Sequence, residues 1–278
     1  MCTTCGKHNA ESLWYLEEER HRIRSLGLFR DIVAKNLNPL ITLGLKLVRR
    51  KRPDYLGSQM PVVSRGLLDW FAKTLHGMQF LPDIDSAFNI IDMANEIALM
   101  PCLCRLTMDP EEPPVYRCIA MNIAARIYQR HDQTVDLREI NKLQAKQLVS
   151  DWREKGAWQS VGWLWDANVI WVCNCDERCV SYRAPEVVWG GIPSFLVSTV
   201  AKPSACSSCM QCANWCKHGA LSFDERDVAV VDAAKCKGCG LCIEHCPDDV
   251  LVLQPRQTYY DITTKTVRHL GSEMVHLD

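Results

Sequence analysis

Cysteines are the residues of this chain most able to do chemistry, and eight of them fall in two runs with the same spacing. Each run reads C-x2-C-x2-C-x3-C, and 19 residues separate the two. Three cysteines at intervals of three residues wrap one [4Fe–4S] cube, and the fourth reaches the other cube. The spacing therefore predicts two clusters with crossed ligands. Cluster one would be held by Cys206, Cys209, Cys212 and Cys246, and cluster two by Cys236, Cys239, Cys242 and Cys216.

The repeat extends beyond the cysteines. Residues 219–223 after the first run correspond to residues 249–253 after the second, and apolar residues 195–197 and 228–231 precede the runs. On these features the segment 195–255 resembles the bacterial-type two-[4Fe–4S] ferredoxin domain. The resemblance implies a small domain that transfers electrons. A zinc ribbon needs two cysteine pairs, so it does not fit this pattern.

The two halves of the repeat differ beside their cysteines. Met210 stands where the second half has Gly240, and Lys217 stands where it has Pro247. Local charge, hydrogen bonds to sulfur and solvent access set the potential of a cluster. The sequence therefore predicts two clusters of different potential, unless the Lys217 side chain simply points into water.

Six more cysteines form a constellation in the middle of the chain. They are Cys102, Cys104, Cys118, Cys173, Cys175 and Cys179. The Pro-Cys-x-Cys-Arg element, the single cysteine and the Cys-Asn-Cys element resemble those of larger cysteine-rich 4Fe–4S proteins of anaerobic bacteria and archaea. Those relatives carry more cysteines where Asp176 and Arg178 stand here. We expect a third iron–sulfur cluster, with zinc, a redox-active thiol pair or inert thiols as alternatives.

Three weaker signals accompany the cysteine runs. Cys2, Cys5 and His8 have the character of a metal half-site. The basic stretch from Lys46 to Arg52 follows an apolar run, so it predicts docking on an acidic partner or a membrane surface. The alternative interpretation is a helix end whose charges are simply solvated. Five tryptophans are expected to form a core that shields metal from water. They are Trp152, Trp158, Trp163, Trp165 and Trp171.

Composition excludes several functions. Among 278 residues, 32 Lys and Arg balance 33 Asp and Glu, which argues against a general nucleic-acid binder. Without a secretory signal in residues 1–20, the 16 cysteines favour metal ligation over disulfides. We expect a cytoplasmic protein. Peripheral contact with the inner face of the membrane is compatible with this location. There is no P-loop, no dinucleotide fingerprint and no paired general acid and base, so no catalytic residue is predicted.

The elements that must position the cysteines are expected to be mainly helical. Helices are predicted in residues 10–26, after Pro61, from Asp83 to the residue before Pro101, and over residues 116–131 and 136–156. In the last of these, Asp136 and Glu139 form a capping box and Gly156 a C-cap. Residues 168–174 read as a buried strand, and residues 185–193 as a linker.

Together these features predict an α+β protein, with a mainly helical N-terminal and central region and a small C-terminal ferredoxin-like two-cluster domain. The expected division is a helical region for partner docking, a cysteine-containing helical domain with an extra metal site, the two-[4Fe–4S] domain and a C-terminal extension. Their bounds are residues 1–100, 101–185, 195–255 and 256–278.

The predicted function is that of an iron–sulfur electron-transfer subunit. It would pass single electrons between a flavoprotein donor and a catalytic oxidoreductase subunit. One alternative is a redox enzyme with its catalytic centre at the central cysteines. The other is a cluster-based redox sensor that reads DNA through a winged helix in residues 136–171, which the near-neutral charge disfavours.

Overall fold

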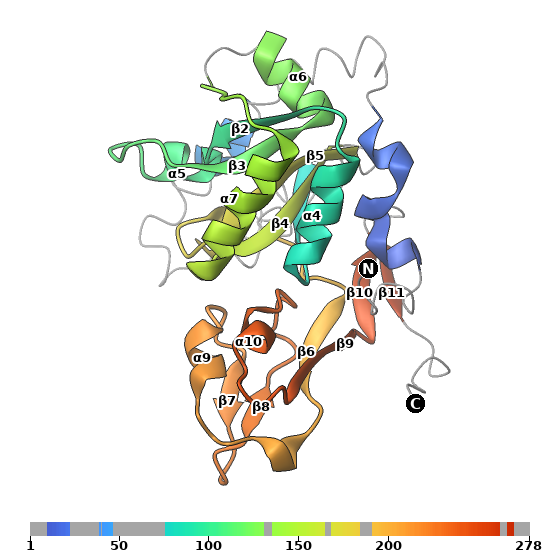
Figure 1. Cartoon of the computed structure of the whole chain (residues 1–278), viewed down its shortest axis with the longest axis vertical. Helices are drawn as coiled ribbons and strands as arrows, with labels where there is room; N and C mark the ends of the chain where they lie inside the picture. Colours follow the sequence, from blue (N-terminus) through green and yellow to red (C-terminus); the bar gives the residue numbers. More distant parts are fainter. Residues whose placement is uncertain are drawn as a thin grey trace.

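The computed structural model describes residues 10–22, 39, 41–46, 76–130, 135–164, 168–183, 191–261 and 266–269. The described elements form an upper body around a large sheet and a lower body that carries the two cysteine runs (Figure 1). Within these residues, no helix is long and apolar enough to cross a bilayer.

A five-stranded antiparallel sheet is the centre of the upper body. Its strand order is β1-β4-β5-β3-β2. The strands are β1 (His76–Phe80), β2 (Ile97–Pro101), β3 (Tyr116–Met121), β4 (Trp158–Leu164) and β5 (Asn168–Cys175). The expected boundary between the first two regions is at residue 100, and strands from both sides of it belong to one sheet.

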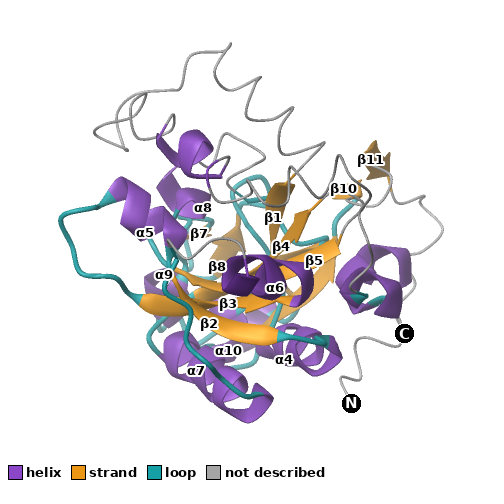
Figure 2. Cartoon of the chain, turned by 90° about the horizontal axis from the view of Figure 1, so that it is seen from above, coloured by secondary structure: helices purple, strands orange, loops and turns teal. Residues whose placement is uncertain are grey.

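Helices cover both faces of this sheet (Figure 2). On one face, α4 (Ile84–Met93) and α7 (Lys142–Glu154) pack against strand residues such as Ile119 and Val172. On the other face, α5 (Leu103–Met108), α6 (Asn122–Arg130) and α8 (Val180–Arg183) lie beside Cys118, Ala120 and Trp171. Successive side chains of a strand point to opposite faces, so β3 and β5 direct their cysteines to the second face.

The prediction of a mainly helical upper region is wrong. Residues 116–121 form β3 rather than the first half of a helix, and α6 begins only at Asn122. The helix predicted after Asp83 ends at Met93, and Ala98 lies in β2. A strand buried on both faces is a continuous apolar run, which periodicity cannot distinguish from a buried helix. The strand predicted over residues 168–174 is confirmed as β5.

Helix α7 begins six residues later than the sequence predicted, at Lys142 instead of Asp136. Its capping box joins Asn141 and Gln144, not Asp136 and Glu139. Gly156 follows the helix with a φ of +83°, so its role at the C-terminal end is confirmed.

The N-terminal residues contribute short 3-10 segments, η2 (Ala10–Leu16) and η3 (Glu18–His21). The Trp14 indole is buried and donates a 2.8 Å hydrogen bond to Gln79 on β1, which fixes this segment on the sheet. The helix predicted after Pro61 lies outside the described residues, as do residues 23–26 of the first predicted helix.

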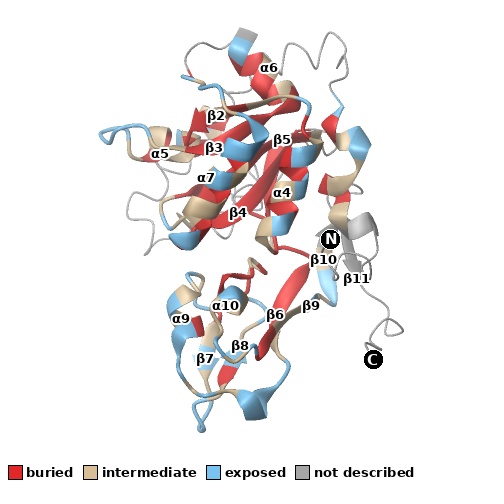
Figure 3. Ribbon diagram, in the orientation of Figure 1, coloured by how far each residue is buried: buried red, intermediate tan, exposed pale blue. Residues whose placement is uncertain are grey.

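The lower body is small and contains little regular structure. Its strands are β6 (Leu196–Val200) paired with β9 (Leu251–Pro255), and β7 (Leu221–Phe223) paired with β8 (Ala229–Val231). Its short helices are η5 (Pro203–Ala205), α9 (Gln211–Trp215) and α10 (Leu241–Glu244). A hairpin of β10 (Thr258–Asp261) and β11 (Thr266–His269) follows. Much of this body is exposed, in contrast to the sheet above it (Figure 3), so bound metal would add stability that its small core lacks.

Candidate iron–sulfur sites

The two cysteine runs fold in the same way. In each, a loop leads into a short helix that begins one residue before the third cysteine, Cys212 in α9 and Cys242 in α10. Each loop turns through two residues of positive φ at matching positions. These are Ser208 and Met210 in the first loop, and Gly238 and Gly240 in the second.

The structure brings the eight cysteines together in two groups. Burial raises the pKa of the Cys212 thiol, and the neighbouring Cys246, Cys209 and Cys206 raise it further. Burial likewise raises the pKa of Cys242 to about 12, with additional contributions from Cys239, Cys236 and Cys216. The fourth cysteine of each run therefore lies with the first three of the other run.

The glycines of the second loop are explained by what the loop contacts. A Cβ on Gly240 would lie 2.2 Å from the carbonyl oxygen of Pro82 in the upper body, and one on Gly238 would lie 2.1 Å from that of Leu196. The corresponding Met210 of the first loop is 44% exposed. The second loop is therefore packed against the rest of the protein, whereas the first faces solvent.

Lys217 does not simply point into water. Its ammonium lies 3.4 Å from the carboxylate of Glu177 in the upper body, and the side chain is partly exposed. Hydrogen bonds to sulfur are found in the second group. The Ala220 amide donates to Cys216 Sγ at 3.2 Å, and the Gly238 amide donates to Cys236 Sγ at 3.4 Å. Such bonds stabilise thiolates, so these residues fit the ligation of a cluster.

All six central cysteines line one cavity on the second face of the sheet. They come from the start of α5, from β3, and from β5 with the loop that follows it. Cys118 and Cys173 are directly opposite each other on adjacent strands. The rest of the wall is largely apolar and includes Leu45, Met100 and Trp171.

The six thiols follow one another around the cavity as a closed ring, in which neighbours shift one another's pKa values. The order around the ring is Cys102, Cys104, Cys179, Cys175, Cys173, Cys118 and back to Cys102. Hydrogen bonds with its two neighbours, followed by burial, raise the pKa of Cys104 well above its usual value. Metal binding would displace the thiol protons, because thiolates are the ligands.

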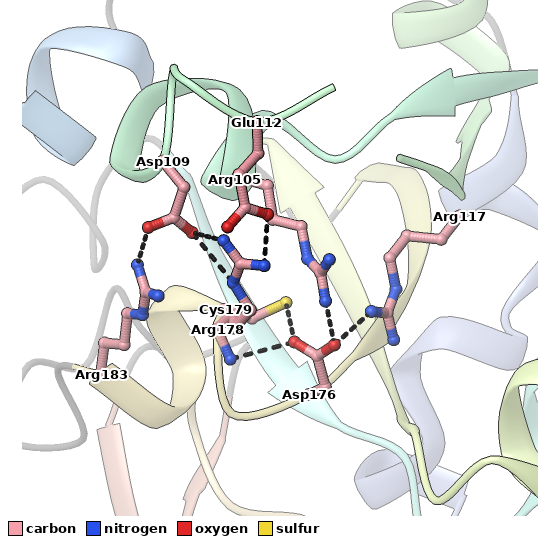
Figure 4. Close-up of polar contacts among 8 residues, drawn as sticks. All are labelled: Arg105, Asp109, Glu112, Arg117, Asp176, Arg178, Cys179 and Arg183. Atoms are coloured by element: carbon pink, nitrogen blue, oxygen red, sulfur yellow. Dashed lines mark hydrogen bonds and ion pairs between the residues drawn. The ribbon is translucent and has the colours of Figure 1, made fainter. Parts of the chain in front are cut away.

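An arginine–carboxylate network holds the cysteine-bearing segments together (Figure 4). Asp176 accepts hydrogen bonds from the side chains of Arg105 and Arg117 and from the Arg178 amide. Asp109 at the end of α5 pairs with the guanidinium groups of Arg178 and Arg183, each at 3.0 Å. The network therefore joins α5, β3 and the segment around Cys179.

Asp176 is a charged structural residue. Burial favours its neutral form, but Arg117, the Arg178 amide and then Arg105 together outweigh burial, and the pKa of Asp176 lies below its usual value. Its carboxylate is occupied by these partners and by a 3.7 Å contact from Cys179 Sγ. Asp176 thus anchors the loop that carries Cys175 and Cys179.

Two buried N–H groups near the central cysteines have no hydrogen-bond acceptor within the described part of the chain. They are Nε of Arg105 and Nε of Arg117. Buried donors are almost always paired, and a thiolate-ligated cluster is an anion that would accept from them. The residues present therefore fit an anionic cluster. Among the described residues, no three His, Cys, Asp or Glu side chains are placed so that they could hold a single metal ion.

Aromatic side chains fill the space between the central cysteines and the second group. His218, two residues after Cys216, lies with its ring centroid 4.7 Å from that of Trp158, 5.2 Å from that of Phe80 and 6.0 Å from that of Tyr182. Trp158 pairs with Cys175 across the sheet. The second group of cysteines is thus the one that adjoins the central site.

The tryptophans are divided between the two faces of the sheet rather than gathered in one core. Trp158, Trp163 and Trp171 are at most 4% exposed, but only Trp158 and Trp171 of the described tryptophans belong to the core that contains the central cysteines, and Trp163 lies in the core on the other face. Trp152 packs under the Arg117 guanidinium. The shielding of metal stays a prediction. Trp165 lies outside the described residues, as do Cys2, Cys5, His8 and, apart from Lys46, the basic stretch.

Sequence reasoning missed several buried charged and polar residues around the sites, among them Arg117, Arg153 and His218. Arg117 lies next to Cys118, and His218 lies near Cys216, so proximity to cysteine in the sequence could have identified them. Arg153 is distant from all the cysteines along the chain, and no signal in the sequence marks it.

We expect the stability of the protein to fall with acid through His76. Its Nδ1 donates a 2.7 Å hydrogen bond to the Trp163 carbonyl oxygen, and burial lowers its pKa from 6.5 to about 4. Between these values the unfolded chain binds a proton that the folded chain does not, so stability is full above pH 6.5 and falls toward pH 4, by up to about 3 kcal/mol. Anaerobic urea unfolding at pH 7.5 and at pH 5 measures this loss.

His76→Asn is the control, because asparagine keeps an N–H donor but does not titrate. The difference between the two proteins separates His76 from the acid lability of clusters. An equal loss of stability in both would contradict the prediction.

Comparison with known proteins identifies the lower body. Residues 205–257 match the family model of the 4Fe-4S dicluster domain. This part of the chain is therefore a 4Fe-4S dicluster domain, which supports two 4Fe-4S clusters.

A relative extends this comparison. Over 79 residues the chain is 33% identical to the thiosulfate reductase electron transfer subunit PhsB of Salmonella typhi, a match that covers 28% of this chain and 39% of the relative. No solved structure matches the chain significantly. The domain and the relative together support an iron–sulfur electron-transfer role.

Proposed function

We propose that this protein is an electron-transfer subunit with three iron–sulfur centres. It passes single electrons between a flavoprotein donor and a catalytic oxidoreductase subunit. The observation that carries the proposal is the position of six cysteines around one cavity, five of them buried, directly beside a dicluster domain. The relative PhsB is named as an electron transfer subunit, which supports the same role.

Each cluster, when bound, would accept and release one electron. Cys206, Cys209, Cys212 and Cys246 would hold cluster one, and Cys236, Cys239, Cys242 and Cys216 would hold cluster two. The third centre would take its ligands from the central ring, where Trp171 excludes water and Arg117 offsets negative charge.

The three centres would lie in order. Cluster two would lie between the central ring and cluster one, because its loop packs on Pro82 and His218, near its ligand Cys216, contacts Trp158. Cluster one would be outermost, since Cys209 is exposed. Electrons would therefore enter or leave through the loop of residues 206–212, where a redox partner can approach most closely.

Iron analysis tests the proposal. Protein purified without oxygen is expected to hold about twelve iron and twelve sulfide per chain, of which about eight come from the dicluster domain. Low-temperature EPR after dithionite reduction should resolve the reduced clusters. Zinc in place of iron, or iron too low for the dicluster domain, would contradict it.

The central cavity favours a second candidate, a redox enzyme that works at the six cysteines. Its wall combines thiols with apolar side chains such as Ile41 and Met78, which is typical of small-molecule sites. A small molecule that perturbs the EPR signal of the third centre, but not of the other two, would favour this candidate. For the DNA-binding sensor, residues 136–171 contribute α7 and the inner strands β4 and β5, and we do not favour it.

The location and the docking surface of the protein stay predictions. We predict that it is cytoplasmic and that it contacts a partner or a membrane through the stretch from Lys46 to Arg52. The division of the chain into four regions also stays a prediction. Only Lys46 of the basic stretch lies within the described residues, and its side chain is exposed.

A further inference from the structure

Arg153 is a buried arginine that joins the two bodies of the protein. It lies in the last turn of α7 and is 4% exposed. Its Nε and Nη2 donate to the two carboxylate oxygens of Glu244 on α10, at 2.8 and 2.6 Å. Both groups of this ion pair belong to the contact between the bodies, because α7 covers the sheet and α10 follows the second cysteine loop.

The same guanidinium reaches the loop of cluster two directly. Its Nη2 donates to the carbonyl oxygen of Cys239 at 2.9 Å, and a Cβ at Gly240 would lie 3.3 Å from this nitrogen. These contacts place the positive charge of Arg153 beside Cys239, where it favours negative charge.

Arg153 is also held from the side of the sheet. Its Nη1 donates to Gln159 at 2.8 Å, Gln159 donates to Asn174 at 3.0 Å, and Asn174 donates to the Arg117 carbonyl oxygen at 2.7 Å. Asn174 lies between Cys173 and Cys175. This chain of buried side chains fixes the guanidinium in position, so its charge cannot move away from the loop.

A fixed buried cation beside a cluster stabilises its reduced form, which carries one more negative charge. The carboxylate of Glu244 opposes this effect, but its side chain is 35% exposed, so solvent screens it more than it screens Arg153. The side chain of Lys155, at the same end of α7, is exposed and lies over the Trp152 ring instead.

We propose that Arg153 is a positioning residue that holds the cluster-two loop against the sheet and raises the reduction potential of cluster two, but not of cluster one. The inference rests on the proposed cluster function. It explains how two loops with the same fold can hold clusters of different potential, since only the packed loop contacts this guanidinium.

Redox titration of the full-length protein, followed by EPR, tests this proposal. In Arg153→Met, the equilibrium constant for reduction of cluster two should fall about tenfold, which is about 59 mV for one electron. Arg153→Lys should recover part of the loss, and Glu244→Gln should shift the potential of cluster two upward. The matched control Lys155→Met removes a charge from the same helix end and should leave both potentials unchanged.

A Cys209→Ser background, which removes a proposed ligand of cluster one, assigns the signal that moves. If Arg153→Met does not fold, Glu244→Gln still gives a shift of defined sign. Equal shifts of both clusters, no shift, or a downward shift in Glu244→Gln would overturn the role of Arg153. Iron too low for two clusters in the unaltered protein would instead overturn the proposed function.

Discussion

Cys246→Ala is expected to remove cluster one, whose other three ligands lie in the first run, and to leave cluster two intact. Cys216→Ala should do the reverse. The reason is the crossed arrangement, in which Cys212 lies with Cys246, and Cys242 lies with Cys216. Each variant should lose about four iron, because a cube missing one thiolate ligand is not retained. Iron analysis and the midpoint potential of the remaining EPR signal measure the outcome.

The control compares variants within and between runs. Cys206→Ala should share the spectrum and potential of Cys246→Ala, and Cys239→Ala should share those of Cys216→Ala. If Cys246→Ala instead matches Cys239→Ala, each run holds its own cluster and the crossed assignment is wrong. Because variants are compared only with one another, the outcome does not depend on which potential belongs to which cluster.

The sequence predicted the cysteine runs well because their chemistry depends on local spacing. A loop of three cysteines is specified within about a dozen residues, and both runs fold in the same way. The short helices α9 and α10 begin one residue before the third cysteine and end before the fourth, so they do not start at the fourth cysteine. The strand of residues 168–174 was likewise found, because it is a short apolar run rich in β-branched residues.

The sheet around the central cysteines could not be predicted in the same way. Residues 116–121 and 158–164 are strands buried on both faces, so they lack the alternation that identifies a half-buried strand. Their pairing joins residues far apart in the sequence, as between Cys118 and Cys173. The ring of six thiols depends on that pairing, and the place of Arg153 beside Cys239 depends on the packing of α7 against the sheet.

The difference between the two cluster loops depends on contacts that the type of a single residue does not reveal. Met210 stands out in the sequence as a departure from Gly240, but the constraint lies at the glycine. Gly240 needs both a left-handed φ of +74° and room beside Pro82. Met210 adopts a similar φ of 58° at an exposed site, where a side chain meets no such obstacle.

Replacing both Cys118 and Cys173 by serine is expected to remove the third centre and lower the iron content by about four per chain. These cysteines face each other on adjacent strands and are consecutive members of the thiol ring. Serine is nearly the same size, so the sheet should persist, but its hydroxyl is a poor ligand for iron–sulfur clusters. The signals of clusters one and two should remain, because their ligands lie in the lower body.

The matched control is Ala120→Ser, two residues along β3 on the same buried face. It buries a hydroxyl in the same core, at a cost of about 1–3 kcal/mol if unpaired, but removes no thiol. If this control also loses iron, the loss reports damage to the core rather than a lost ligand. Full iron in the double serine variant would mean that the ring holds inert thiols, and a loss of zinc instead of iron would identify a zinc site.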